Sequence, residues 1–130
     1  MKQHSILALA AILGALAVGL GAFGAHGLRD MVSSADLEIW NTAVRYQAWH
    51  ALALVLLGVV TSRAGCTDRG ALIGWAFLVG SLLFSGSIYG LALDGPGAVL
   101  GPITPLGGLC LIIGWGALGW SAFRADGKPA

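Results

Sequence analysis

The stretch that decides the fold is GALIGWAFLVGSLLFSGSIYGLAL, residues 70–93, which carries no charge between Arg69 and Asp94. At 1.5 Å per residue this run makes a helix of about 36 Å, which crosses a hydrocarbon core of about 30 Å. The whole chain of 130 residues is 57% hydrophobic and 10% charged, whereas soluble domains carry about 25% charged residues. The sequence therefore predicts a membrane protein.

Outward from this run, three further apolar stretches have the length of a membrane span. We expect spans at about residues 5–28, 42–62 and 106–123, in addition to 70–93. The predicted architecture is an all-α integral membrane protein, with one transmembrane domain over residues 1–130 that forms a four-helix bundle.

Two of the segments between spans carry structural signals. Residues 29–40 have a water-facing composition, and Ser33 and Ser34 ahead of Asp36 are typical of a helix N-terminus. A short amphipathic entry helix is therefore expected between spans one and two, and it could continue into span two as one helix to about Ser62. Residues 95–105 hold three prolines and three glycines, so we expect a loop or a re-entrant turn there, since proline cannot donate a backbone hydrogen bond.

The basic residues beside the spans predict the orientation. One side of the bundle would hold five of them, Lys2, Arg63, Arg69, Arg124 and Lys128, and the other side only two, beside four acids. Because cytoplasmic loops are enriched in lysine and arginine, we expect both termini in the cytoplasm, with Trp40 and Trp49 at the outer interface. Met1 and Lys2 ahead of the apolar run also fit a secretory signal, an alternative in which the first span is cleaved.

The polar side chains of the spans are expected at one depth, in the outer third of the bundle. These candidate binding residues are His26, Arg45, Tyr46, Gln47, His50, Ser85, Ser87, Tyr89 and Thr104. A polar face of this kind normally points into a bundle, because an unpaired polar group in lipid is costly. The other half of each span is mainly aliphatic residues and glycine, and glycine lets helix backbones approach closely.

These residues support two main interpretations. In the first, they hydrogen-bond to one another and to the backbone, and so hold the helices together. In the second, they line a small pocket open to the outer side, where Arg45 and His50 contact a small anion or a lipid headgroup. Arg45 also has a structural explanation, because at the end of a span it can reach headgroups or pair with Glu38 or Asp94.

Two other kinds of site have weaker support. His26 and His50, if at the same depth, would suit an axial pair for haem, but no acid or further histidine accompanies them. Ser85, Tyr89 and His50 are side chains that acid–base enzymes use, yet no nucleophile with a base is evident. We therefore predict no cofactor and no enzymatic activity.

Metal sites, ion-coupled transport and nucleic-acid binding are disfavoured. Cys66 and Cys110 have no partner at zinc-ligand spacing, and they are expected at different depths, too far apart for a disulfide. No acid lies within a span, which argues against a carrier coupled to protons or cations. A net charge of +1 without a basic stripe argues against nucleic acid as a partner.

Four segments together resemble a known family: GAFGAHGL at 21–28, RYQAWHALAL at 45–54, FSGSIYGLAL at 84–93 and GPITPLGGL at 101–109. The chain resembles the YgdD-like family of small four-helix inner-membrane proteins, a domain of unknown function whose eukaryotic relatives are the transmembrane protein 256-like proteins. The resemblance implies four helices and the bacterial inner membrane, and it carries no known ligand or catalytic residue. Its motifs map onto Gly21, His26, Gly27, Tyr46, Gln47, His50, Ser85, Gly86, Thr104 and Pro105.

The function expected from these features is that of a non-enzymatic accessory or scaffold protein. Its expected partners are membrane lipids and either another membrane protein or further copies of this chain, since glycine-rich spans favour close helix packing. The alternative is a binder or transporter of a lipid or a small anionic molecule, through the outer-facing polar pocket.

Overall fold

The computed structural model describes residues 3–64 and 68–126, and this part of the chain is helical without strands. It contains four long helices, α1 (Gln3–Phe23), α2 (Ser34–Ala64), α3 (Asp68–Ala92) and α4 (Gly97–Asp126). A π-helical segment, η1 (Gly24–Leu28), continues α1. The predicted all-α architecture is confirmed.

Each long helix is long and apolar enough to cross a membrane. The first and third candidate spans, His4–Leu28 and Arg69–Ala92, lie within two residues of their predicted limits. The second and fourth candidate spans, Ser34–Thr61 and Gly97–Arg124, begin earlier than predicted, by eight and nine residues. The two extensions cover the segments that the sequence analysis had placed between spans.

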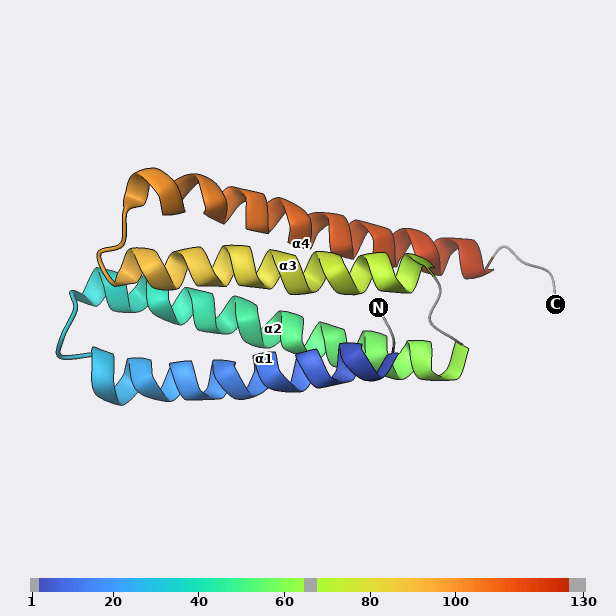
Figure 1. Ribbon diagram of the computed structural model, residues 1–130, viewed down its shortest axis with the longest axis horizontal. Helices are drawn as coiled ribbons and strands as arrows, with labels where there is room; N and C mark the ends of the chain where they lie inside the picture. The colour runs from blue at the N-terminus through green and yellow to red at the C-terminus, as the bar shows by residue number, and fades with distance from the viewer. Residues whose placement is uncertain (1–2, 65–67, 127–130) are drawn as a thin grey trace.

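The four helices lie antiparallel in a row, in the order α1, α2, α3, α4 (Figure 1). Extensive contacts join α1 to α2, α2 to α3, and α3 to α4. An apolar core runs through all four helices and includes Ile6, Leu54, Phe77 and Leu111. The two edge helices, α1 and α4, therefore expose wide apolar faces, as a membrane-embedded bundle requires.

The amphipathic segment forms the first turns of α2 and leads directly into the second span, as expected of an entry helix. The Ser33 hydroxyl accepts a hydrogen bond from the Asp36 amide at 3.1 Å and donates to the Asp36 carboxylate. This cap satisfies an otherwise unpaired amide and starts the helix where the sequence predicts a start. The helix then continues unbroken, because residues 34–46 contain no glycine or proline.

α3 ends in a tight turn at the predicted position. The Gly95 amide donates to the Gly90 carbonyl at 2.8 Å, and the Asp94 amide donates to the Leu91 carbonyl at 3.2 Å. Asp94 has a φ of 57°, so the turn is a Schellman motif with an aspartate in the left-handed position. A Cβ at Gly95 would lie 2.6 Å from the Gly90 oxygen, and this turn therefore requires glycine.

The expectation of a loop or re-entrant turn over residues 95–105 was wrong. α4 begins at Gly97 and contains both Pro102 and Pro105. In lipid an irregular segment would leave many backbone groups unpaired, whereas a helix with two prolines loses only two backbone donors. The helical alternative is therefore less costly, and it brings Thr104 onto a regular helix facing α3.

Glycines bring α3 and α4 into close contact. A Cβ at Gly107 would lie 2.3 Å from the backbone nitrogen of Phe84, and one at Gly80 would lie 2.6 Å from the Leu111 side chain. Other glycines of α4 have open space, among them Gly116, where a Cβ would meet no atom within 4 Å. The predicted packing role of glycine therefore holds for a subset of the glycines.

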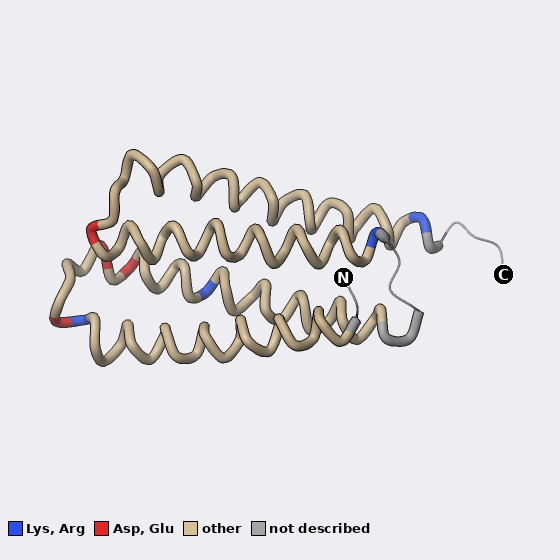
Figure 2. The backbone as a smooth tube through the Cα atoms, viewed as in Figure 1, with Lys and Arg blue, Asp and Glu red and all other residues tan. Residues whose placement is uncertain are grey.

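Most charged residues of the described part lie toward the two ends of the bundle (Figure 2), and Arg45, eleven residues into α2, is the exception. Asp36, Glu38 and Asp94 lie at the end where α1 leads to α2 and α3 leads to α4. Arg69 and Arg124 lie at the opposite end, where α3 begins and α4 ends. We call these the acidic end and the basic end.

Candidate functional site

Polar side chains meet in the middle of the bundle around Gln47, which is 5% exposed. Its Nε2 donates to the Leu13 carbonyl of α1 at 2.9 Å, and its Oε1 accepts a hydrogen bond from the Tyr89 hydroxyl of α3 at 3.0 Å. Because an amide side chain has both donors and acceptors, this one residue of α2 bonds to both neighbouring helices.

Two further hydrogen bonds attach α2 to its neighbours. The buried Ser85 hydroxyl of α3 donates to the Ala43 carbonyl at 2.9 Å. The Trp40 indole N–H donates to the Leu20 carbonyl of α1 at 2.9 Å, and its ring packs on Tyr89 with 4.5 Å between centroids. All these acceptors are main-chain carbonyls inside helices, so the bonds fix the relative positions of the helices.

His50, which is 4% exposed, is held on both sides of its ring. Its Nδ1 lies 2.7 Å from the Tyr46 carbonyl, and its Nε2 lies 3.2 Å from the indole nitrogen of Trp115 in α4. A carbonyl only accepts and an indole N–H only donates, so these bonds assign a neutral His50 with its proton on Nδ1. Both ring nitrogens are occupied and cannot also bind a ligand.

A pair of hydroxyls joins α3 to α4. Ser87 Oγ and Thr104 Oγ1 lie 2.7 Å apart, and each is also within hydrogen-bond distance of a carbonyl in its own helix. Ser81, which is 2% exposed, differs from them because its hydroxyl has no partner within residues 3–64 and 68–126.

Six of the nine predicted site residues make these contacts between helices, which together we call the central polar layer: Gln47, His50, Ser85, Ser87, Tyr89 and Thr104. The other three contribute differently. Tyr46 supplies its carbonyl to His50 and packs its ring on Phe84. Arg45 is exposed and donates to the Thr42 hydroxyl at 3.1 Å, and His26 is exposed on η1. The expectation that His26 is buried in the cluster was wrong, because at the end of a span its side chain reaches the surface.

The depth of Gln47 and His50 also differs from the prediction, whereas the polar residues of α3 and α4 lie within seven residues of the turn between these two helices, at the predicted depth in their spans. Gln47 lies level with Leu13, to which it is bonded, whereas His26 lies thirteen residues beyond Leu13 and His50 three residues beyond Gln47 in the opposite direction. Roughly 24 Å therefore separates the two histidines along the bundle axis, too far for one haem iron. The prediction started the second span eight residues too late, which placed Gln47 in the outer third and not in the middle.

Two tryptophans were missed as parts of the layer. Trp40, six residues after the start of α2, is 3% exposed and bonded to the Leu20 carbonyl inside the bundle. Gly24 makes room for it, because a Cβ there would lie 2.8 Å from Trp40 Cδ1. The available signal was chemical: an indole N–H far from water needs an acceptor, which predicts a protein partner for the Trp115 indole even though half of its side chain is exposed.

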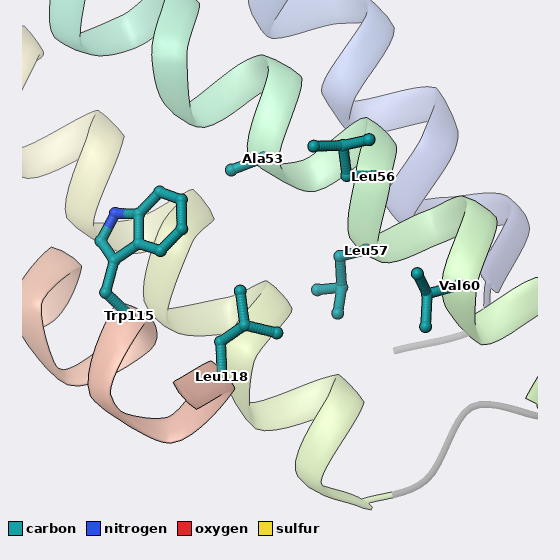
Figure 3. Close-up of a pocket in the computed structure, with 6 residues that line it drawn as sticks. All are labelled: Ala53, Leu56, Leu57, Val60, Trp115 and Leu118. Carbon is teal, nitrogen blue, oxygen red and sulfur yellow. The ribbon is translucent and has the colours of Figure 1, made fainter. Parts of the chain in front are cut away.

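A pocket of about 150 Å³ lies between α2 and α4 (Figure 3), and its lining is apolar: Ala53, Leu56, Leu57, Val60, Trp115 and Leu118. No group of three or more His, Cys, Asp or Glu side chains is placed to hold a metal ion in the described part of the chain. Cys110 is half-buried and free, and Cys66 lies outside the described residues.

Comparison with known proteins gives the family. Residues 20–108 match the family described as a protein of unknown function (DUF423). The chain belongs to this family. The resemblance to YgdD-like proteins is consistent with DUF423 membership.

Relatives of this DUF423 protein are named as bacterial membrane proteins. A UPF0382 membrane protein of Staphylococcus aureus (strain bovine RF122 / ET3-1) is 45% identical over 120 residues, which cover 89% of this chain and 96% of the relative. The UPF0382 membrane protein YwdK of Bacillus subtilis (strain 168) is 43% identical over 107 residues, covering 82% and 86%. No solved structure matches the chain. The chain is therefore a membrane protein of a family of unknown function.

Proposed function

We propose that this DUF423 protein is a non-enzymatic accessory or scaffold subunit of the bacterial inner membrane. The observation that supports it is the internal bonding of the central polar layer. Gln47 bonds to the Leu13 carbonyl and to the Tyr89 hydroxyl. His50 bonds to the Tyr46 carbonyl and to the Trp115 indole. A substrate site or proton path needs polar groups that face the ligand, whereas these groups hold neighbouring helices in place.

The edge of the row at α1 provides a surface for a partner helix. α1 packs mainly on α2, and its exposed face carries Ala11, Ala15 and Gly19, each one turn from the next. A Cβ at Gly19 would meet no atom within 4 Å. Small residues at this spacing let a second transmembrane helix approach closely, and we propose that the partner is a helix of another membrane protein.

The orientation proposed for this scaffold has both termini in the cytoplasm. Arg69 and Arg124 at the basic end, and four acids beside a single arginine, Arg29, at the acidic end support it, because cytoplasmic segments are rich in basic residues. Reporter fusions after Arg124 and within residues 95–99 test the orientation. A periplasmic signal from the fusion after Arg124 would overturn it.

In vivo crosslinking tests the scaffold proposal. A photoreactive amino acid at Ala15 should give one discrete adduct with a different membrane protein, and Gly19→Ile should abolish the adduct by blocking close approach. Gly86→Ile is the matched control, because Gly86 is also an exposed helical glycine without an atom within 4 Å of an added Cβ. An adduct consisting only of two copies of this chain, or no discrete adduct, would contradict the proposal.

The alternative of an outer-facing polar pocket for a lipid or a small anion has less support. It requires Arg45 and His50 to face a common space. Arg45 is exposed and bonded to Thr42, whereas His50 is buried and bonded at both nitrogens.

A further inference from the structure

The apolar pocket between α2 and α4 is not used by the central polar layer. Its inner wall is buried, since Ala53 is 7% and Leu57 6% exposed, while its rim is open, with Leu56 67% and Val60 63% exposed. The lining side chains come from α2 and α4 and flank one space (Figure 3). α3 lies between α2 and α4 in the row, so the pocket is a groove on one face of the row. Its exposed rim therefore opens perpendicular to the bundle axis, toward the surrounding lipid.

The shape of the pocket suits a hydrocarbon chain better than a helix. From Ala53 to Val60 the lining extends about 10 Å along α2, parallel to the bundle axis. A volume of about 150 Å³ corresponds to roughly five water-sized groups at about 30 Å³ each. A helix is about 10–12 Å wide with its side chains and does not enter such a space.

The chemistry of the lining also indicates a hydrocarbon. Trp115 supplies the only polar side-chain group among the lining residues, and its indole N–H donates to His50. A bound group therefore finds no free side-chain donor or acceptor in the pocket, and only apolar contacts contribute to its affinity.

The end of the bundle nearest the pocket carries exposed arginines. Arg124 follows the pocket lining on α4 by six residues, about 9 Å, and Arg69 lies at the start of α3 at the same end. The Arg124 guanidinium lies 4.9 Å from the ring centroid of Trp120. Asp68 and Asp126 are near neighbours in the sequence, but arginine is the side chain that best binds phosphate oxygens, through paired hydrogen bonds.

We propose that the α2–α4 pocket binds one acyl chain of an anionic phospholipid, whose phosphate lies at Arg69 and Arg124. The acyl chain of one lipid molecule then occupies the apolar pocket, and its phosphate reaches the arginines at the adjoining basic end. This site shares only Trp115 with the polar layer, and it does not depend on the scaffold role.

Native mass spectrometry of the full chain tests the proposal, with release from nanodiscs made of equal parts phosphatidylglycerol and phosphatidylcholine. We expect one phosphatidylglycerol retained per chain. Ala53→Phe, which fills the inner wall, and Leu56→Trp, which blocks the rim, should each abolish its retention. Leu52→Trp is the matched control, because Leu52 is 63% exposed on α2 but does not line the pocket.

The arginines determine which lipid is bound. Arg69→Gln and Arg124→Gln should each lower the ratio of retained phosphatidylglycerol to phosphatidylcholine about fivefold, from the usual attraction of one surface arginine to anionic lipid. Arg45→Gln, an exposed arginine in the half of α2 nearer the acidic end, should leave the ratio unchanged.

Three outcomes would overturn the proposal. Phosphatidylglycerol that is still retained by both Ala53→Phe and Leu56→Trp would show that the lipid binds elsewhere. Equal retention of the two lipids, insensitive to Arg69 and Arg124, would remove the anionic headgroup from the site. A second copy of the chain retained in place of lipid, and lost in Leu56→Trp, would make the pocket a contact between protomers. Circular dichroism of each variant ensures that only helical, folded chains are compared.

Discussion

The α2–α3 interface and the α3–α4 interface hold helices together in different ways. Between α2 and α3, polar side chains reach across, as Ser85 does to a carbonyl and Tyr89 does to Gln47. Between α3 and α4, the backbones approach closely, and Gly107 lies directly against the main chain of Phe84. The α2–α3 interface is held by hydrogen bonds, whereas the α3–α4 interface combines one hydroxyl pair, Ser87 and Thr104, with backbone contacts that require the absence of a side chain.

This difference determines how each interface responds to substitution. Lipid is as apolar as the helices, so no hydrophobic force drives them together and packing and polar bonds must do so. A single interhelical hydrogen bond contributes on average about 0.6 kcal/mol. Overpacking typically costs about 1–3 kcal/mol, and most where the contact is backbone and cannot rotate away. We therefore expect the α3–α4 interface to be the more sensitive to single substitutions.

The largest effect is expected for Gly107→Ala. The added Cβ would lie 2.3 Å from the Phe84 nitrogen and 2.7 Å from its Cα, so the two helices must separate. We expect a loss of about 3 kcal/mol in the free energy of unfolding, the upper end for overpacking, measured by SDS titration in mixed micelles.

Gly116→Ala is the control for this prediction, because Gly116 lies on the same helix and a Cβ there would meet no atom within 4 Å. It should leave the free energy of unfolding within about 0.5 kcal/mol of the parent, as is usual for surface substitutions. Equal effects of the two substitutions would show that close backbone contact does not hold α3 and α4 together.

The next largest effect is expected for Gln47→Leu at the hydrogen-bonded interface. The substitution removes the bonds to the Leu13 carbonyl and the Tyr89 hydroxyl and leaves that hydroxyl without its partner. We expect a loss of about 1.5 kcal/mol, near the upper end for bonds within membranes.

A double-mutant cycle with Tyr89→Phe isolates the bond between the two side chains. The double variant should be more stable than the sum of the single effects predicts, by about 0.5–1 kcal/mol, because the bond is lost only once. Strict additivity of Gln47→Leu and Tyr89→Phe would mean that the bond contributes nothing to stability.

Ser81→Ala should change stability in the opposite direction. Ser81 is buried, and its hydroxyl has no partner within the described residues, unlike that of Ser85 one turn away. Removing an unsatisfied buried group should stabilise the protein by about 1 kcal/mol. Ser85→Ala is the matched comparison and should be destabilising; a loss of stability in Ser81→Ala would show that its hydroxyl has a partner.

The sequence was sufficient to predict the helices, because lipid leaves few other ways to pair a backbone. The same rule explains the error at residues 95–105, where proline was interpreted as it would be in water. Pro102 and Pro105 are acceptable in α4, since a break in lipid would be more costly than two missing donors.

The polar layer was predicted in composition but not in arrangement. Gln47 and Ser85 lie at least seven residues from the ends of their helices, and a polar group there must face protein. Tyr89 is only three residues from the end of α3, and its hydroxyl reaches Gln47. His26 and Arg45 are exposed, and sequence position did not separate them from the layer. The order of helices in a row was also beyond the sequence analysis, because it depends on which helix faces pack together.

The smallest effect is expected at the bond that connects α2 to α4 across the row. Trp115→Phe keeps an aromatic ring beside Phe77 but removes the donor to His50, so we expect a loss of about 0.6 kcal/mol in the free energy of unfolding. Trp75→Phe is the matched control, because both indoles are 50% exposed and, in the described part of the chain, the Trp75 indole has no bond like that of Trp115 to His50.

Nitrogen NMR of histidine-labelled protein makes this prediction sharper than stability alone. The parent chain should show His50 neutral with its proton on Nδ1, since Nδ1 donates to the Tyr46 carbonyl while Nε2 accepts from Trp115. In Trp115→Phe the Nε2 resonance should shift as its donor is lost, while Trp75→Phe should leave it in place. A proton on Nε2 in the parent chain would contradict the bond itself, and α2 and α4 would then be joined only through α3.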